Sequence, residues 1–426
     1  MKKIFFLSAV LLLTLSLGLI AQTHVKQIII GNGGIYGNPS DNVTLAAYNP
    51  DDQITTTFGN ILRESVQDLI ICDNYAYVTA EDSIVKFNID SYQKVASVYE
   101  SNLNRLFYHD GLLFVSRRSD INGPPADGIY LKIFNAEDLS LVAAVEGISS
   151  DVAGIAVAQD TVYVAVSGDW QATEGKFAVI DLQTYSLVRE MNFGTDAVGI
   201  YDLFTNGEEI FTVNKSPYGA TTGSVTTYDV ASAMFSTSVI NSVVGKAVEL
   251  EGDILYLGLD NGIGSYDVTS NQIVQNTIVP DPGSTDFIYI AAAAFDSINQ
   301  LFYVTITDYF SMGEGKIFDM SGNETGSFEA DVSAEAIAVD YRLNEFVETN
   351  PVSGIKIFPN PFSGEIIIED ATFTEIRVLS LHGQTVYENS SNRFNNRVDL
   401  SFLKNGIYFI EIKTDDNSII KKIVKR

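Results

Sequence analysis

Residues 154–191, GIAVAQDTVYVAVSGDWQATEGKFAVIDLQTYSLVREM, contain four short β-rich runs separated by turns. Gly154–Ala158 is an apolar run of small residues that suits a crowded axis, and the polar pair Gln159-Asp160 ends it. Three further strands follow, at 162–166, 177–180 and 187–191. A four-stranded unit of about 45 residues is typical of one blade of a β-propeller.

The same unit recurs along residues 22–350, where an apolar or aromatic residue, then Asn or Asp, then a polar turn, marks seven copies. The copies are Tyr48-Asn49, Phe87-Asn88, Phe134-Asn135, Ile180-Asp181, Tyr228-Asp229, Tyr266-Asp267 and Phe318-Asp319, spaced by 38 to 52 residues. An Asn or Asp side chain suits this turn because its oxygen can accept hydrogen bonds from backbone amides beyond it. The repeat predicts an all-β chain with a seven-bladed β-propeller.

The two ends of the repeat region complete one blade. Residues 26–58 supply only three strands, whereas 68–98, 105–146, 199–240, 246–279 and 288–329 each fit four. Glu335–Asp340, which follows the last full repeat, can supply the missing inner strand. Joining the ends in one sheet would close the ring and leave no open sheet edge, so we expect circular closure.

The N-terminus is typical of a secretory signal peptide at residues 1–21. Lys2 and Lys3 precede an apolar run from Ile4 to Ile20. An N-terminal membrane anchor is the alternative, but the run is short for a span and a polar chain follows. We therefore expect an exported mature chain with no transmembrane anchor. Cys72 is the single cysteine, which excludes an intramolecular disulfide and a cysteine-based zinc cluster.

Charge divides the remaining chain into two domains. The formal net charge is −28, and residues 22–351 hold 14 basic against 45 acidic side chains. Such an acidic surface repels phosphates, so nucleic acid is excluded as a partner. The tail is almost neutral, β-rich and rich in turns. We expect a propeller at 22–350 and a small immunoglobulin-like β-sandwich at 351–426.

The fourth repeat resembles the YVTN-type repeat of surface-layer propellers. Its matching residues are Val162-Tyr163-Val164-Ala165 and Val179-Ile180-Asp181, and Tyr77–Ala80 and Tyr303–Ile306 are similar to the first of these motifs. The resemblance covers most of residues 26–341 and implies the propeller fold more than a function.

The tail resembles the type A C-terminal sorting domain of the type IX secretion system. The matching motifs are IKIFPNPF at 355–362, VLSLHGQ at 378–384, LKNGIYFI at 403–410 and KKIVKR at 421–426. The resemblance implies a Bacteroidota-type host, recognition by the type IX machinery and removal of the tail after export. The sorting residues it indicates are Pro359, Asn360, Pro361, Gly383, Gly406, Tyr408, Lys421 and Lys422. The alternative is an accessory β-sandwich, with a rigid turn around Asn360.

Five long loops between the second and third strands should crowd one rim of the ring, at 31–42, 117–128, 167–176, 214–224 and 307–316. Loops of this length are uncommon without a reason. Aromatic and arginine side chains on a rigid rim favour a ligand-binding face, although they could also pack among the loops. The candidate binding residues are Tyr36, Arg117, Arg118, Trp170, Tyr218, Tyr309 and Phe310.

Catalytic and metal-binding signals are weak. The three histidines, His24, His109 and His382, lie outside the long loops. Asp120, Asn122 and Asp127 could offer oxygen ligands to Ca²⁺, but their spacing departs from the EF-hand loop and turn chemistry explains them better. Gly31–Gly34 is not followed by the Lys-Ser/Thr of a phosphate-binding loop.

We therefore expect a secreted or surface-attached, non-enzymatic binding propeller whose ligand is a glycan, a corrinoid or another nutrient. One alternative is a metal-dependent, lactonase-like hydrolase with carboxylates at the channel mouth. Its candidates by position are Asp68, Asp196, Asp286 and Glu335. The other alternative is an adhesin that uses the propeller as a protein-binding platform.

Overall fold

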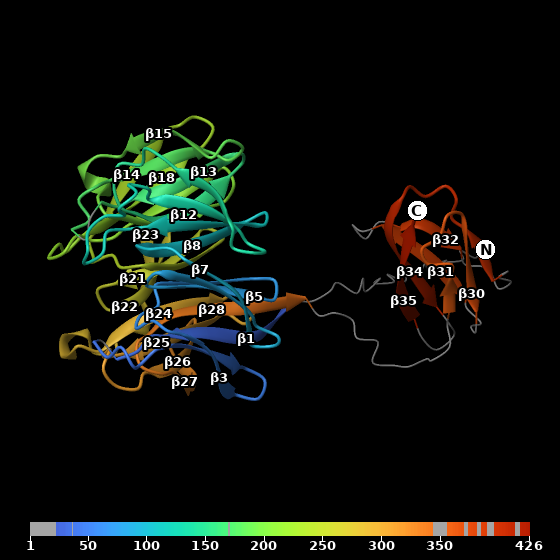
Figure 1. The fold of residues 1–426 in the computed structure, drawn as a ribbon, viewed down its shortest axis with the longest axis horizontal. Helices are drawn as coiled ribbons and strands as arrows, with labels where there is room; N and C mark the ends of the chain where they lie inside the picture. Colours follow the sequence, from blue (N-terminus) through green and yellow to red (C-terminus); the bar gives the residue numbers. More distant parts are fainter. Residues whose placement is uncertain are drawn as a thin grey trace, which may run out of the picture. The chain divides into compact units, whose positions relative to one another are not determined.

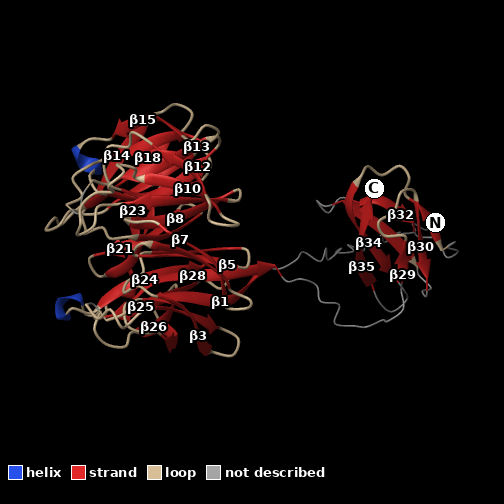
Figure 2. Cartoon of the chain, in the orientation of Figure 1, coloured by secondary structure: helices blue, strands red, loops and turns tan. Residues whose placement is uncertain are grey.

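A computed structural model describes residues 23–35, 37–168, 171–343, 356–369, 374–380, 385–389, 396–413 and 418–426. The expected signal peptide, Tyr36, Trp170, His382 and Gly383 lie outside these ranges. The described structure is all-β, with two short 3-10 helices, η1 (Thr195–Ala197) and η2 (Ser284–Asp286) (Figure 2). None of its helices has the length and apolar character of a membrane span. The chain forms two compact units, 1–344 and 345–426.

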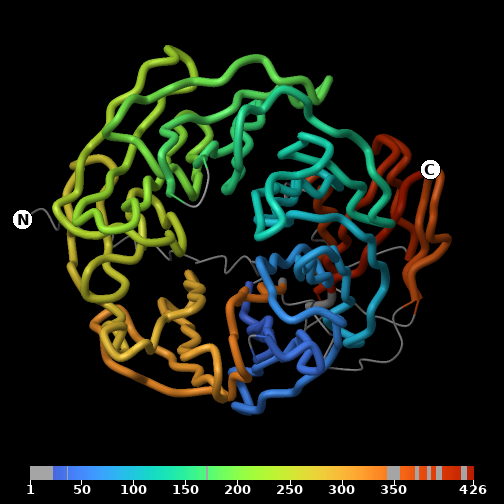
Figure 3. Tube along the Cα trace, turned by 60° about the vertical axis from the view of Figure 1, so that its left-hand side comes forward, coloured from blue at the N-terminus to red at the C-terminus, as the bar shows by residue number. Residues whose placement is uncertain are grey.

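Within the described part of unit 1, the strands form seven four-stranded antiparallel sheets (Figure 1). In order from the inner strand outward, they are β28 (Ala334–Leu343), β1 (Thr23–Asn32), β2 (Val43–Asn49) and β3 (Ile54–Ile61); β4 (Asp68–Cys72), β5 (Tyr75–Ala80), β6 (Ser83–Asn88) and β7 (Gln93–Tyr99); β8 (Leu103–His109), β9 (Leu112–Arg117), β10 (Leu131–Asn135) and β11 (Leu141–Val145); β12 (Val152–Ala158), β13 (Thr161–Val166), β14 (Lys176–Asp181) and β15 (Ser186–Asn192); β16 (Ile200–Thr205), β17 (Glu209–Asn214), β18 (Gly223–Asp229) and β19 (Phe235–Ile240); β20 (Ala247–Glu251), β21 (Ile254–Leu259), β22 (Gly262–Asp267) and β23 (Gln272–Pro280); β24 (Tyr289–Asp296), β25 (Leu301–Thr307), β26 (Glu314–Asp319) and β27 (Glu324–Glu329). The sheets lie around a common axis, as expected of a β-propeller (Figure 3).

The recurring Asn or Asp ends the third strand of each sheet. In all seven copies, its side-chain oxygen accepts a backbone N–H two or three residues farther on, at 2.6–3.0 Å. The preceding apolar residue points into the core, and Phe87, Tyr228 and Tyr266 are almost completely buried. The repeat therefore combines a turn and a core anchor in two adjacent residues.

The chain ends of unit 1 meet in one sheet. The closing strand, β28, pairs antiparallel with β1 from Thr23↔Leu343 to Asn32↔Ala334. A polar network extends this closure: the Gln27 amide donates to Asp340 at 2.9 Å and to the Ile89 carbonyl at 3.0 Å. The pairing expected for Glu335–Asp340 is thus present, and the strand is longer at both ends.

The sheets stack through apolar side chains. Between the fourth and fifth sheets, Phe177 lies 5.2 Å from Tyr163 and 5.0 Å from Tyr228, measured between ring centroids. All three rings are buried. Burying an aromatic side chain of this size stabilises a fold by about 1.5–3 kcal/mol. The stacking turns the inner strands into a rigid wall around the axis, which positions the site described below.

Unit 2 consists of two small sheets around its own core. One contains β29 (Lys356–Phe358), β30 (Glu365–Glu369) and β33 (Arg397–Asp399), and the other contains β32 (Thr385–Asn389), β31 (Glu375–Ser380), β34 (Gly406–Lys413) and β35 (Ser418–Lys425). Phe362, Ile366, Ile376 and Ile410 are among the side chains buried in this core.

Candidate functional site

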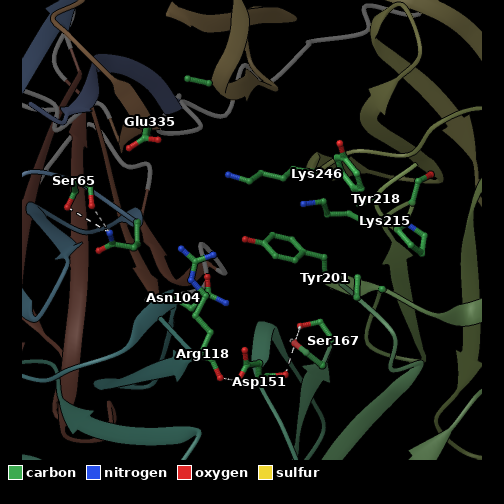
Figure 4. Close-up of a pocket in the computed structure, with 18 of the residues that line it drawn as sticks. Ser65, Asn104, Arg118, Asp151, Ser167, Tyr201, Lys215, Tyr218, Lys246 and Glu335 are labelled. Carbon is green, nitrogen blue, oxygen red and sulfur yellow. Dashed lines mark hydrogen bonds between the residues drawn. The ribbon is translucent and has the colours of Figure 1, made fainter. Parts of the chain in front are cut away.

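A polar pocket of about 440 Å³ lies where the inner strands of unit 1 begin (Figure 4). Two kinds of segment form its wall. One kind joins consecutive sheets and contributes Gln67, Asp151 and Lys246. The other joins the second and third strands of a sheet and contributes Arg118 and Tyr218. Because both kinds emerge at the same end of the ring, residues far apart in the sequence share this pocket.

A cationic group dominates one side of the pocket. Lys215, Lys246 and Tyr201 point the same way into it, and Glu335 lies across from them (Figure 4). The Lys215 Nζ atom lies 4.3 Å from the centre of the Tyr201 ring, a cation–π contact. Burial lowers the pKa of Lys215, and the neighbouring Lys246 and Arg105 lower it further. The pocket therefore holds its positive charge at some electrostatic cost.

The same cations act on Tyr201. Burial raises the pKa of its phenol, but Arg105, Lys246 and Lys215 together outweigh burial, so the pKa lies below the ordinary value. The local potential around this ring is therefore positive, in a unit that is strongly acidic in composition. Such a local reversal of sign favours negatively charged groups.

A glycine positions Lys215. Gly199 has a φ of +79°, and a side chain there would place its Cβ 2.3 Å from the Lys215 carbonyl oxygen. The close approach lets the Lys215 amide donate to the Gly199 carbonyl at 2.9 Å. Gly199 thereby holds the start of the 215–222 loop against the inner strand β16.

An ion-pair bridge lies behind the cationic group. Arg105 on β8 donates to Asp68 on β4 at 3.2 Å and to Asp202 on β16 at 3.0 Å. The second oxygen of Asp202 accepts the Ala247 amide at 2.8 Å, which adds β20 to the network. Arg105 therefore ties inner strands of different sheets together, and both of its carboxylate partners are mostly buried.

Carboxylates line the rest of the pocket. Asp151 is buried and accepts a hydrogen bond from the Ser119 hydroxyl at 2.8 Å. Burial raises the pKa of Glu335, although Lys246 and Arg118 pull it in the opposite direction. A second cavity of about 650 Å³ shares Lys215, Lys246 and Glu335 with the first and continues along Ala291–Ala293. The two cavities are therefore adjoining.

The loop after β25 directs one tyrosine inward and its neighbour outward. Tyr309 lines the pocket in a left-handed conformation, with φ +66°, and its amide donates to the Thr307 hydroxyl at 2.9 Å. Asp308 accepts the amides of Phe310 and Ser311, both at 2.8 Å, so the turn is fixed. Phe310 is 64% exposed and is not among the residues that line the pocket.

The structure brings together only part of the residue set predicted from the sequence. Arg118, Tyr218 and Tyr309 line the pocket, whereas Tyr36 and Trp170 lie outside the described residues. Sequence reasoning missed Tyr201, Lys215 and Lys246. The available signal was the rule that segments joining consecutive blades share a rim with the long loops. That rule was applied to the long loops alone.

The prediction that Arg117 lies on a binding face is wrong. Its side chain is almost completely buried, and it pairs with Glu100 at 2.9 Å and with Asp127 at 2.7 Å. Lys132 contacts the same two carboxylates, at 2.9 and 2.8 Å. Because every one of these charges already has a partner, Arg117 stabilises the base of the 118–130 segment and does not face a ligand.

The carboxylates considered for metal binding have other roles. Asp120 accepts the Asn122 amide at 2.7 Å, which is turn chemistry, and Asp127 is engaged by Arg117 and Lys132. Asp68 is engaged by Arg105. Among the residues that the structure describes, no group of three or more His, Cys, Asp or Glu side chains is arranged to hold a metal ion. Asp196 and Asp286 lie in η1 and η2 and line neither cavity.

In unit 2, the Pro-Asn-Pro segment is bound to the basic C-terminal strand. The Asn360 amide nitrogen donates to the Lys422 carbonyl at 2.9 Å, and its oxygen accepts the Val424 amide at 2.9 Å. The Phe362 amide donates to the Val424 carbonyl at 2.9 Å, and the Phe362 ring is buried. The first and last motifs of the tail therefore form one structural element.

The other predicted sorting residues lie apart from this element. The Tyr408 hydroxyl donates to the Lys404 carbonyl at 2.9 Å, which holds the turn before Gly406. Lys422 is exposed and Lys421 is half-buried on β35.

We expect Asn360→Ala to destabilise unit 2 by about 1–2 kcal/mol, because two hydrogen bonds to the β35 backbone are lost. Chemical unfolding of the purified chain measures this change, and immunoblots of medium, cell surface and periplasm measure export. The matched control is Asn396→Ala, an exposed asparagine of the same unit. Unchanged stability and export in Asn360→Ala would show that this bracket is dispensable.

Comparison with known proteins identifies the tail by family and the remainder by fold. Residues 356–426 match the family model described as the secretion system C-terminal sorting domain. A search of curated proteins finds no match. Kuenenia stuttgartiensis hydrazine synthase is 12% identical, with a TM-score of 0.50 over 64% of this chain and 88% of that one. A hypothetical selenium-binding protein from Sulfolobus tokodaii is 10% identical, with a TM-score of 0.55 over 75% and 94%. At these identities the likeness concerns the fold alone.

Proposed function

We propose that this chain, which a type IX sorting domain directs to the cell surface or the medium, is a non-enzymatic ligand-binding protein. Its binding module is a seven-bladed propeller of YVTN type at 22–350, preceded by a signal peptide at 1–21. The tail at 351–426 is an immunoglobulin-like sorting domain that engages the type IX machinery. The ligand is a small polar nutrient of the glycan or corrinoid kind.

One observation carries this proposal: a rigid polar pocket in which aromatic and charged side chains from several sheets converge. Tyr201, Tyr218 and Tyr309 offer aromatic surface, while Lys215, Lys246 and Glu335 offer charges. Pockets with a few converging polar groups on a rigid scaffold are the usual form of small-molecule sites. The metal-dependent hydrolase is not preferred, because its carboxylates at Asp68 and Asp196 are engaged or placed elsewhere.

Thermal unfolding of the purified chain in the presence of neutral and acidic oligosaccharides and corrinoids tests this function. A ligand at about 100 times its Kd adds about 2.7 kcal/mol of stability. We expect Tyr218→Ala to weaken binding of the ligand found by about tenfold, which is about 1.4 kcal/mol. Tyr218 is 94% exposed, so its removal should leave the fold intact.

Tyr99→Ala is the matched control, because Tyr99 is 70% exposed on the outer strand β7. Equal ligand affinity in wild type, Tyr218→Ala and Lys215→Met would place the binding site elsewhere. The absence of any stabilising ligand in the panel would favour the adhesin alternative.

A further inference from the structure

We propose that the ligand of this pocket is anionic and that Lys215 and Lys246 bind its carboxylate, sulfate or phosphate group. This inference rests on the proposed binding function and adds the chemical class of the ligand. It begins with how scarce positive charge is in unit 1. Residues 22–351 hold 14 basic side chains against 45 acidic ones, so a basic residue there usually has an acidic neighbour.

Most basic side chains of this unit are in fact paired. Those with a carboxylate within 4 Å are Lys26, Arg63, Arg105, Arg117, Lys132, Lys176, Lys316 and Arg342. Lys86 instead donates to the carbonyls of Ala136 and Glu137. Within the described ranges of unit 1, five basic residues show no such partner, and three of them, Arg118, Lys215 and Lys246, line the same pocket.

The other two unpaired cations show why the grouping matters. Lys94 on β7 and Arg189 on β15 are exposed on outer strands, where water solvates a lone charge at little cost. Lys215 is half-buried between the Tyr201 ring and the ring wall, with Lys246 and Arg105 as like-charged neighbours. Its unpaired charge is therefore costly in the free protein, and a bound anion would relieve that cost.

The neutral polar groups of the pocket are already engaged, which leaves the cations as the available donors. The Asn104 amide donates to the Val152 carbonyl at 2.7 Å. The Ser216 hydroxyl accepts the Val244 amide at 2.9 Å, and the Ser119 hydroxyl donates to Asp151 at 2.8 Å. Arg105 is held by Asp68 and Asp202 and so supports the cluster from behind. An anion entering the pocket would thus meet Lys215 and Lys246 first.

The size of the site favours an acidic sugar chain over a free inorganic ion. A cavity of about 440 Å³ that adjoins another of about 650 Å³ is much larger than sulfate or phosphate. Tyrosine side chains beside the cations, at positions 218 and 309, offer surface against which sugar rings can lie. We therefore commit to a carboxylated or sulfated oligosaccharide and treat free phosphate and sulfate as separate arms of the test.

The test is calorimetric titration of the full mature chain with four probes: tetragalacturonate, its methyl ester, inorganic sulfate and inorganic phosphate. We expect tetragalacturonate to bind and its methyl ester, which lacks the charge, to bind at least tenfold more weakly. Lys215→Met/Lys246→Met should reduce affinity for tetragalacturonate by about 10- to 100-fold, and added salt should weaken binding of the wild type. Lys94→Met, an exposed and unpaired lysine, is the matched control and should change nothing.

Each outcome decides the inference. Equal affinity for the acid and its ester, or equal affinity of the double variant and the wild type, would overturn the anionic class. Such a result would leave the proposed binding function intact, because a neutral ligand that depends on Tyr218 would still support it. Binding of sulfate or phosphate alone would overturn the oligosaccharide and retain the oxyanion site. Binding of none of the four probes would overturn this inference.

Discussion

Arg105→Met is expected to lower the free energy of unfolding of unit 1 by about 3–5 kcal/mol. The substitution removes the cation that Asp68 and Asp202 share and leaves two mostly buried carboxylates beside each other. It also removes the contact of the guanidinium with the Tyr201 ring, at 5.1 Å. Urea unfolding followed by fluorescence measures the loss, provided that the denaturant slope stays constant.

The matched control for this experiment is Arg63→Met. Arg63 pairs with Asp82, and both side chains are about a third exposed, so we expect a loss of at most about 1 kcal/mol. A triple variant, Arg105→Met/Asp68→Asn/Asp202→Asn, should recover part of the lost stability because the unpaired charges are gone. An Arg105→Met protein as stable as the Arg63→Met control would contradict the bridge as a stabilising element.

Deletion of residues 334–343 from the full chain is expected to abolish the cooperative unfolding of unit 1. The deletion removes β28, its ladder with β1 and the buried side chains of Ala334, Ala336 and Ile337. The free edge of β1 would then be open to pairing with another chain. The expected loss exceeds about 5 kcal/mol, a large part of the stability of a typical domain. Differential scanning calorimetry and light scattering measure the lost transition and the aggregation.

Deletion of residues 356–426 is the matched control, because unit 2 has its own core and belongs to a separate compact unit. We expect it to leave the transition of unit 1 unchanged. If the chain without β28 kept a transition within about 2 kcal/mol of the control, closure by this strand would not be what holds unit 1 together.

Together, these two experiments address what makes the pocket rigid. Arg105 joins inner strands of different sheets, and β28 joins the two ends of unit 1. The pocket wall contains residues next to both features, since Glu335 lies on β28 and Lys246 adjoins β20. A site assembled from several sheets keeps its geometry only while those sheets are held in register around the axis.

Much of the fold follows from local sequence. The Asn or Asp that ends each third strand encodes its own turn, because its side chain needs only backbone amides two or three residues away. The small residues of Gly154–Ala158 indicate an inner strand, and the strand at 335–340 has no partner nearer than the N-terminus. The sorting motifs are contiguous, so the tail was recognisable without a structure.

The candidate site was only partly predictable, because its residues are brought together by the ring. Tyr218 and Tyr309 were found as aromatic residues in long loops, and both line the pocket. Arg117 was misassigned, since only the fold shows that Glu100, Ser101 and Asp127 enclose its side chain. Lys215 and Lys246 carry no local motif. What singles them out is the lack of a carboxylate within 4 Å among the described residues, and that is a property of three-dimensional neighbours.

The sequence by itself thus determined the repeat, the turns, the closing strand and the export signal of the tail, because each depends on residues within one short segment or on a periodic pattern. The tertiary structure alone decided which charges are paired, which tyrosines face inward and where Lys215 meets Tyr201. Those properties depend on distances between segments about 100 residues apart or more, such as the one that Arg105 spans to Asp202. The physical reason is that charge pairing and burial are set by neighbours in space, whereas turn and strand formation are set mainly by neighbours in the chain.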